Sequence, residues 1–145
     1  MPFLLDVNVL IARVDPWHEH HERVTRWERD NASEYFVTCP LTQNGFLRIY
    51  GHPRYPGGPG SPAEAMVELR HLFGLRTHRF VSDSLSLSDT RVFRSLSGIT
   101  PKQLTDVYLL GLAVSEGIDF ATTDSRIHHE GVVRGRNKLC VIPKP

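Results

Sequence analysis

Short apolar runs alternate along the chain with longer stretches in which apolar residues recur at helical spacing. The short runs predict strands, the first of which is expected to be buried and the second of which, at residues 35–37, is rich in aromatic and β-branched residues. These strands are expected at residues 3–5, 35–37, 78–81, 118–123 and 139–142. The stretches with three- and four-residue spacing predict helices. These helices are expected at residues 8–12, 17–31, 40–49, 63–75, 88–96 and 100–117.

The order of these elements predicts the fold class. Strands that alternate with helices favour an α/β fold with a central, mostly parallel sheet of four to five strands and helices on both faces. Residues 52–62 contain four prolines and three glycines and predict a loop. Thr100 and Pro101 are typical of a helix start, and Gly117 is typical of a helix end.

Length and composition narrow the class further. The chain has 145 residues, 40% hydrophobic and 23% charged, which predicts a single folded domain spanning residues 1–145. Cys39 and Cys140 are the only cysteines, which excludes a disulfide-rich scaffold. No apolar run reaches the roughly 20 residues of a membrane helix. The N-terminus meets Asp6 too soon for a signal peptide. We therefore expect a soluble, cytoplasmic protein.

The charge is distributed unevenly. Residues 1–124 carry 12 Lys and Arg against 15 Asp and Glu, a net charge of −3. Residues 125–145 carry five basic side chains against one acid, a net charge of +4. A purely electrostatic nucleic-acid binder is far more basic than this. A nucleic-acid ligand would therefore have to meet local basic groups beside an acidic body.

Three aspartates are candidates for a common site. Asp6 follows the first predicted strand, and Asp124 follows the fourth. Ligands of parallel sheets bind beyond the carboxyl ends of the strands, so both acids stand where a ligand is expected. Asp106 lies near the start of an otherwise apolar helix, where an acid is expected to face a pocket at the surface.

Each aspartate alone has an ordinary interpretation. Asp6 or Asp124 by itself is more often a helix cap, and Asp106 by itself is more often an acid that complements the helix dipole. Together they predict a cation site. One pair of like charges about 4 Å apart costs on the order of 4 kcal/mol at an effective dielectric constant near 20. Oxygen ligands without nearby His or Cys suit Mg²⁺ or Mn²⁺, and such an ion supports hydrolysis of a phosphodiester.

Four segments carry a resemblance to a known family. They are LLDVNVLIA at residues 4–12, TCPLTQNGFLRIY at 38–50, TDVYLLGLA at 105–113 and DFATTDSRI at 119–127. In this order they resemble the PIN-domain family, and within it the VapC-type toxins of bacterial VapBC toxin–antitoxin pairs. The resemblance spans about residues 3 to 142.

The resemblance implies a fold, an activity and partners. It implies an α/β/α sandwich and a metal-dependent endoribonuclease that cleaves structured cellular RNA, tRNA or rRNA, and so inhibits translation. It further implies that acids matching Asp6, Asp106 and Asp124 bind Mg²⁺, with Mn²⁺ as an alternative, and that Asn8 and Thr122 support them. A homodimer and a cognate VapB-type antitoxin are the implied partners.

One position departs from the family pattern. Gln43 stands where the family usually has glutamate, and its neutral amide removes one negative charge from the expected site. We expect weaker metal binding and strongly reduced cleavage with an intact fold. Either a natural substitution or one introduced to disable a toxic enzyme would account for this residue.

Three further features bear on the ligand. Arg54 and Tyr55, in the loop after the Gln43 helix, are candidate RNA contacts that we expect near the edge of the site, and Arg126 is a third. For each, a flexible connector or solvated basic residue is the competing interpretation. The segment Trp17 to Glu22 has His and Glu at spacings that a zinc site can use, although packed or surface histidines are favoured.

Two other functions stay open. A natural Gln43 is compatible with an inactive PIN protein that binds RNA or antitoxin without cleavage. An aspartate after a first strand also occurs in small-molecule phosphohydrolases, but these usually need a second aspartate two residues on, where this chain has Asn8.

Overall fold

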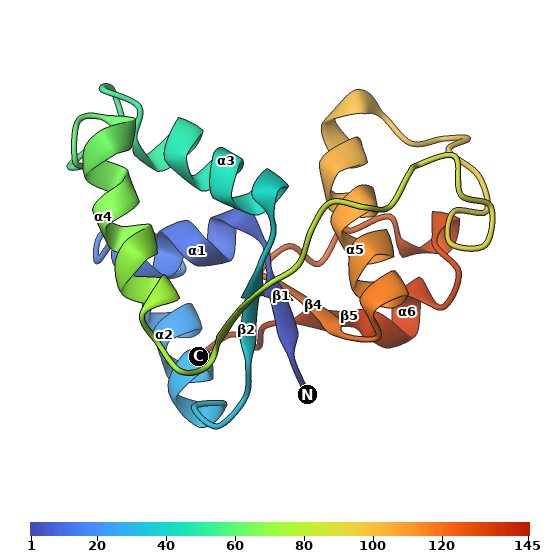
Figure 1. Cartoon of the computed structure of the whole chain (residues 1–145), viewed down its shortest axis with the longest axis horizontal. Helices are drawn as coiled ribbons and strands as arrows, with labels where there is room; N and C mark the ends of the chain where they lie inside the picture. Colours follow the sequence, from blue (N-terminus) through green and yellow to red (C-terminus); the bar gives the residue numbers. More distant parts are fainter.

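Five short strands form one parallel sheet in the order β3-β2-β1-β4-β5, seen in a computed structural model that describes residues 1–145 (Figure 1). All four strand pairs are parallel. The strands are β1 (Phe3–Leu5), β2 (Phe36–Thr38), β3 (His78–Phe80), β4 (Asp119–Thr122) and β5 (Leu139–Val141). The expected α/β class with a parallel sheet is confirmed.

Six α-helices and two short 3₁₀ helices connect the strands. The α-helices are α1 (Val7–Val14), α2 (His21–Asp30), α3 (Pro40–Tyr50), α4 (Pro62–Phe73), α5 (Leu104–Glu116) and α6 (Gly135–Lys138). The 3₁₀ helices are η1 (Pro101–Gln103) and η2 (His129–Gly131). None of the helices combines the length and the apolar character that crossing a bilayer requires.

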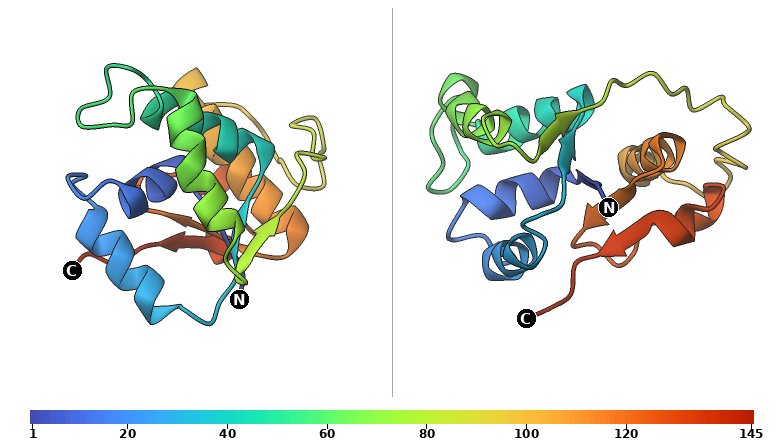
Figure 2. Two further views of the ribbon diagram at one scale, coloured as in Figure 1. Left: turned by 60° about the vertical axis from the view of Figure 1, so that its left-hand side comes forward. Right: turned by 60° about the horizontal axis from the view of Figure 1, so that its bottom comes forward.

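The alternation of side chains along the strands creates two hydrophobic cores. In β1, Phe3 and Leu5 join buried residues of α1, α2, α3 and α4 on one face. Leu4, between them, joins the apolar side of α5 on the other face. Helices therefore cover both faces, as Figures 1 and 2 show, and the expected α/β/α sandwich is confirmed.

The strand order places a topological switch point between β1 and β4. The chain first builds outward from β1 to β2 and β3, and then returns to add β4 and β5 on the other side of β1. The backbone N–H of Asp6 donates to the carbonyl of Ala121 at 3.0 Å, so β1 and β4 end side by side. Ligands of such sheets bind at this position. Asp6 and Asp124 therefore flank the switch point.

The long helix expected at residues 100–117 is confirmed. Thr100 and Gln103 form a capping box around η1, which continues directly into α5. The helix ends at Gly117, whose φ of 70° is the left-handed conformation that favours glycine. Asp106 is in the first turn of α5, so this start fixes its position.

Two expected helices differ from the structure. The helix expected from Trp17 begins only at His21, because the Asp15 carboxylate accepts the Trp17 N–H at 3.0 Å and holds a turn there. Residues 88–96 are not helical: Asp89 bonds the Arg91 N–H, and Phe93 forms a β-bridge with Val132. Local side-chain bonds and a distant partner outweigh the helical spacing in these two segments.

Candidate active site

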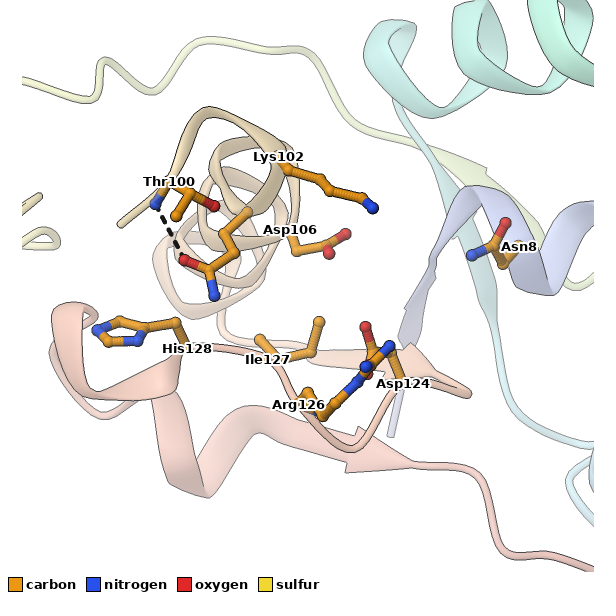
Figure 3. A pocket seen from close by; sticks show the side chains of 9 residues that line it. Asn8, Thr100, Lys102, Asp106, Asp124, Arg126, Ile127 and His128 are labelled. Carbon is orange, nitrogen blue, oxygen red and sulfur yellow. Dashed lines mark hydrogen bonds and ion pairs between the residues drawn. The ribbon is translucent and has the colours of Figure 1, made fainter. Parts of the chain in front are cut away.

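A polar cavity of about 400 Å³ opens at the switch point, between the start of α1, the start of α5 and the segment after β4 (Figure 3). Only one of its nine lining residues is hydrophobic. The lining residues are Asn8, Thr100, Lys102, Gln103, Asp106, Asp124, Arg126, Ile127 and His128. The structure thus brings two of the three predicted acids, together with Asn8 and Arg126, to one place.

Asp6 lies next to this cavity as a buried carboxylate, only 5% exposed. Although it occupies the N-cap position of α1, its side chain makes no capping hydrogen bond. Its Oδ2 instead accepts the Thr122 hydroxyl at 2.7 Å. Burial raises the pKa of Asp6, the charge of Asp124 adds to the rise, and the Thr122 hydrogen bond opposes it.

Thr122 connects two of the acids. Its hydroxyl donates to Asp6 and accepts the backbone N–H of Asp124 at 3.1 Å. The Thr122 side chain is completely buried, so this hydroxyl has one fixed environment. A single residue at the end of β4 therefore sets the positions of the Asp6 carboxylate and the Asp124 main chain.

Asp124 forms a local turn and also faces the cavity. Its Oδ1 accepts the backbone N–H of Arg126 at 2.8 Å and lies 3.4 Å from Nε of the same residue. No helix begins at Asp124, so its Oδ1 stabilises a turn and does not cap a helix as the ordinary interpretation expected. Oδ2 has no protein partner, and the carboxylate lies on the cavity wall (Figure 3).

Asp106 is the acid that the protein leaves without support. Its carboxylate has neither a hydrogen-bond donor nor an ion-pair partner within the chain, and it points into the cavity (Figure 3). Burial, followed by the charges of Asp6 and Asp124, raises the pKa of Asp106 to about 7. Because the charges of Asp6 and Asp124 both act on Asp106, the three acids lie close together in space although they are remote in the sequence.

The donor set fits a hard divalent cation. Three carboxylates lie at one edge of the sheet, and a cation would relieve the repulsion among them and bond to the Asp106 carboxylate, which has no protein partner. As the side chains lie, no group of three His, Cys, Asp or Glu is close enough together to hold an ion. Asp106 and Asp124 therefore line the cavity and Asp6 is buried next to it, without the three converging on a single point, and joint coordination requires side-chain rotation.

Lys102 is a cavity residue that the sequence interpretation missed. It precedes Asp106 by four residues, which places both on one side of the helix start, and both side chains line the same cavity (Figure 3). The four-residue spacing between Lys102 and Asp106 is the sequence signal that could have identified Lys102. With Arg126, whose guanidinium is largely exposed, it gives the cavity two cations beside its acids.

Gln43 lies at the same edge of the sheet but not in the cavity wall. It is the fourth residue of α3, and its Nε2 donates to the Thr38 hydroxyl at 3.0 Å. That hydroxyl also lies 2.8 Å from Nε2 of His78. The amide of Gln43 is thus held at the end of β2, the strand next to β1.

The loop with Arg54 and Tyr55 is not at the edge of the site, so that expectation is wrong. The loop follows the far end of α3, and both residues line a separate shallow hollow. The Tyr55 hydroxyl donates to the buried Asp15 at 2.6 Å, and its ring packs edge-on against Tyr50 at 5.1 Å. These contacts use the side chain that was expected to stack on RNA.

Comparison with known proteins identifies the family. No family model matches the chain. Ribonuclease VapC44 of Mycobacterium tuberculosis is 42% identical over 127 residues, which cover 88% of this chain and 89% of that protein. The chain belongs to the VapC family. Ribonuclease VapC38 and ribonuclease VapC39 of the same organism are 37% and 32% identical, over 86% and 88% of this chain.

Membership in the VapC family agrees with the fold and with the predicted resemblance. The matches to VapC44 and VapC38 cover 89% and 86% of those proteins, so the similarity is not confined to one motif. The names of these relatives describe nucleases. A polar cavity with aspartates at the switch point of the sheet is the feature of this VapC chain that fits such chemistry.

Proposed function

We propose that this chain is a metal-dependent endoribonuclease toxin of a type II toxin–antitoxin pair. One observation supports the proposal most strongly. The Asp106 carboxylate is half-buried and without a protein partner, it shares a cavity with Asp124, and the charges of Asp6 and Asp124 both raise its pKa. A folded protein rarely leaves an acid in this position unless the acid serves a ligand.

The three aspartates share one ion in the proposed site but differ in how the protein supports them. Asp6, Asp106 and Asp124 would hold a divalent cation, which when bound orients an attacking water and stabilises the charge that develops on the phosphodiester. The Thr122 hydroxyl keeps Asp6 in place and holds the main chain at Asp124. Asp106, which has no such support, is free to rotate toward the ion.

The neighbouring polar and basic residues would bind the substrate. Asn8 lies across the cavity from Asp106 and offers an amide to a phosphate or water oxygen (Figure 3). Lys102 and Arg126 bring positive charge to the phosphate, which offsets its repulsion by the acids. RNA is the proposed substrate because the VapC relatives are ribonucleases.

The proposed biological context follows from family membership. The target is structured cellular RNA, tRNA or rRNA, with translation as the process inhibited. A cognate VapB-type antitoxin neutralises the toxin, and a basic side chain of the antitoxin would pair with the aspartates of the cavity. The active form is a homodimer.

Gln43 is proposed to limit the activity. Its amide donates a hydrogen bond to Thr38, whereas a glutamate at this position would accept one and add a negative charge at the edge of the sheet next to Asp6. We expect Gln43→Glu to raise the rate of RNA cleavage about tenfold or more through tighter metal binding.

Labelled structured RNA incubated with Mg²⁺, Mn²⁺ or EDTA tests the proposal. The chain and Gln43→Glu should both cleave RNA in either metal, Gln43→Glu faster, and neither should cleave in EDTA. Undiminished cleavage in EDTA would contradict the metal dependence, and equal rates would contradict the role of position 43. RNA binding without cleavage, even in Gln43→Glu, would favour an inactive binding protein. Hydrolysis of small phosphate esters with RNA intact would favour a phosphohydrolase.

A further inference from the structure

A second polar cavity adjoins the first and shares three residues with it. Its volume is about 440 Å³, and none of its ten lining residues is hydrophobic. Asn8, Asp124 and Arg126 border both cavities, so the two lie side by side at these residues. A ligand whose reacting group lies at Asp106 and Asp124 would extend into this second cavity.

The second cavity is richer in basic groups than in acids. Arg23, Arg126 and Lys144 line it against Glu19 and Asp124. Two histidines add further hydrogen-bonding groups to the same wall; they are His18 and His20. A polar cavity with excess positive charge beside a nuclease site has the chemistry of a phosphate subsite.

Two buried contacts hold this wall in place. Arg23 is only 7% exposed, and its Nε and Nη2 both donate to the carbonyl of Ile142, the former at 2.8 Å. This anchors the chain after β5 and brings Lys144, two residues later, to the cavity. The anchored segment belongs to the basic part of the chain, residues 125–145.

His18 has a defined tautomer in the same wall. Its Nδ1 accepts the backbone N–H of His20 at 3.0 Å. Burial and the neighbouring His20 lower the pKa of His18, which favours a neutral ring near pH 7. A neutral ring that accepts at Nδ1 carries its proton at Nε2, so His18 is a neutral donor and Lys144 a charged one.

We infer that this second cavity binds the RNA phosphate next to the one that is cleaved. Lys144 and Arg126 contact its oxygens, and His18 donates a hydrogen bond. Arg23 is a positioning residue that acts through Lys144. The inference rests on the proposed function, because the neighbouring phosphate belongs to the RNA whose cleavage is proposed at the aspartates.

Binding of a fluorescein-labelled single-stranded oligoribonucleotide in EDTA, measured by anisotropy from 50 to 300 mM salt, tests the subsite. Lys144→Ala should weaken binding about fivefold at low salt and reduce the slope of log Kd against log salt by about 0.7, the value for one phosphate contact on a single strand. Lys144→Arg should restore both quantities. His18→Ala should weaken binding by about threefold without changing the slope, because it removes a neutral donor.

Two controls separate this subsite from general electrostatics and from stability. Arg76→Ala removes an exposed cation just before β3, at the opposite edge of the sheet, and should change neither affinity nor slope. Arg23→Ala should reduce the slope in the original chain but cause no further reduction in Lys144→Ala, because both act on one contact. Circular dichroism confirms that each variant is folded.

The outcomes distinguish failure of the subsite inference from failure of the proposed ribonuclease function. RNA cleavage in Mg²⁺ with the Lys144→Ala slope unchanged would overturn the subsite and leave the proposed function standing. An equal loss in Lys144→Ala and Arg76→Ala would also overturn it, because the effect would be one of overall charge. Absence of RNA binding and cleavage in the chain and in Gln43→Glu would overturn the proposed function and the subsite together.

Discussion

Two buried or half-buried aspartates in this protein have opposite surroundings. Asp15, 6% exposed, accepts the Tyr55 hydroxyl at 2.6 Å and the Trp17 backbone N–H at 3.0 Å. Asp106 accepts nothing, and its strongest neighbours are two further acids. Asp15 is a satisfied group that fastens the loop after α3 to the end of α1, whereas Asp106 lacks partners for its charge.

The difference shows how a functional acid is separated from a structural one. Both residues lose water on folding, and the protein compensates that loss only at Asp15. An uncompensated carboxylate raises the free energy of the folded state, so its retention at a cavity indicates a ligand. Changes at the two positions should therefore affect different quantities.

The largest expected effect is on activity at Asp106. Asp106→Asn in the Gln43→Glu background should lower kcat/KM for RNA about a thousandfold, equivalent to about 4 kcal/mol of lost transition-state stabilisation. The melting temperature in EDTA should not fall, because no partner is lost. Asp119→Asn, at the opposite end of β4, is the matched control and should retain activity. A fully active Asp106→Asn would contradict the assignment.

The next effect is on stability at Asp15. Asp15→Ala leaves the Tyr55 hydroxyl and the Trp17 N–H without their acceptor and should lower the free energy of unfolding by about 3 kcal/mol. Urea denaturation measures this loss. Activity per folded molecule should be retained at low temperature. An unchanged free energy of unfolding would show that the Asp15 contacts are not structural.

A smaller effect concerns pH. Because the folded-state pKa of Asp106 is raised to about 7, the folded protein binds a proton that the unfolded chain has released above about pH 4. The stability that protonated Asp106 contributes is fully present below the pKa of this residue in the unfolded chain. It is lost as the pH rises through the folded-state pKa of about 7.

In EDTA, the chain should therefore lose on the order of 2 kcal/mol relative to Asp106→Asn between pH 4.5 and 8, a figure reduced for solvent screening. Urea denaturation of both proteins across this range measures the difference. Mg²⁺ should reverse the loss at pH 8. Parallel pH profiles for the two proteins would show that Asp106 is not destabilised.

Much of the framework could be predicted from the sequence because its signals are local. The apolar run Phe3–Leu5, the start at Thr100 and Pro101 and the end at Gly117 each depend on a few neighbouring residues. The prediction of a helix at residues 88–96 was wrong because Phe93 packs against the distant Gly111 and pairs with Val132. Such non-local contacts leave no local pattern.

The candidate site was predictable in part for the same reason. Asp6 and Asp124 stand at strand ends, and the strand alternation implied a shared edge. The position of the Arg54 loop depends on the direction of α3, which carries it away from that edge. The basic wall with Lys144 depends on an Arg23–Ile142 contact across 119 positions of the chain, which no spacing reveals.

The central claim is that three remote aspartates bind one divalent ion, and diffraction from a crystal soaked in Mn²⁺ tests it most directly. We predict an anomalous peak bordered by Asp6, Asp106 and Asp124, with the Asp106 side chain rotated toward it. The peak should be absent in a soaked crystal of Asp106→Asn. Strong anomalous density elsewhere, with no density at the three aspartates, would contradict the account.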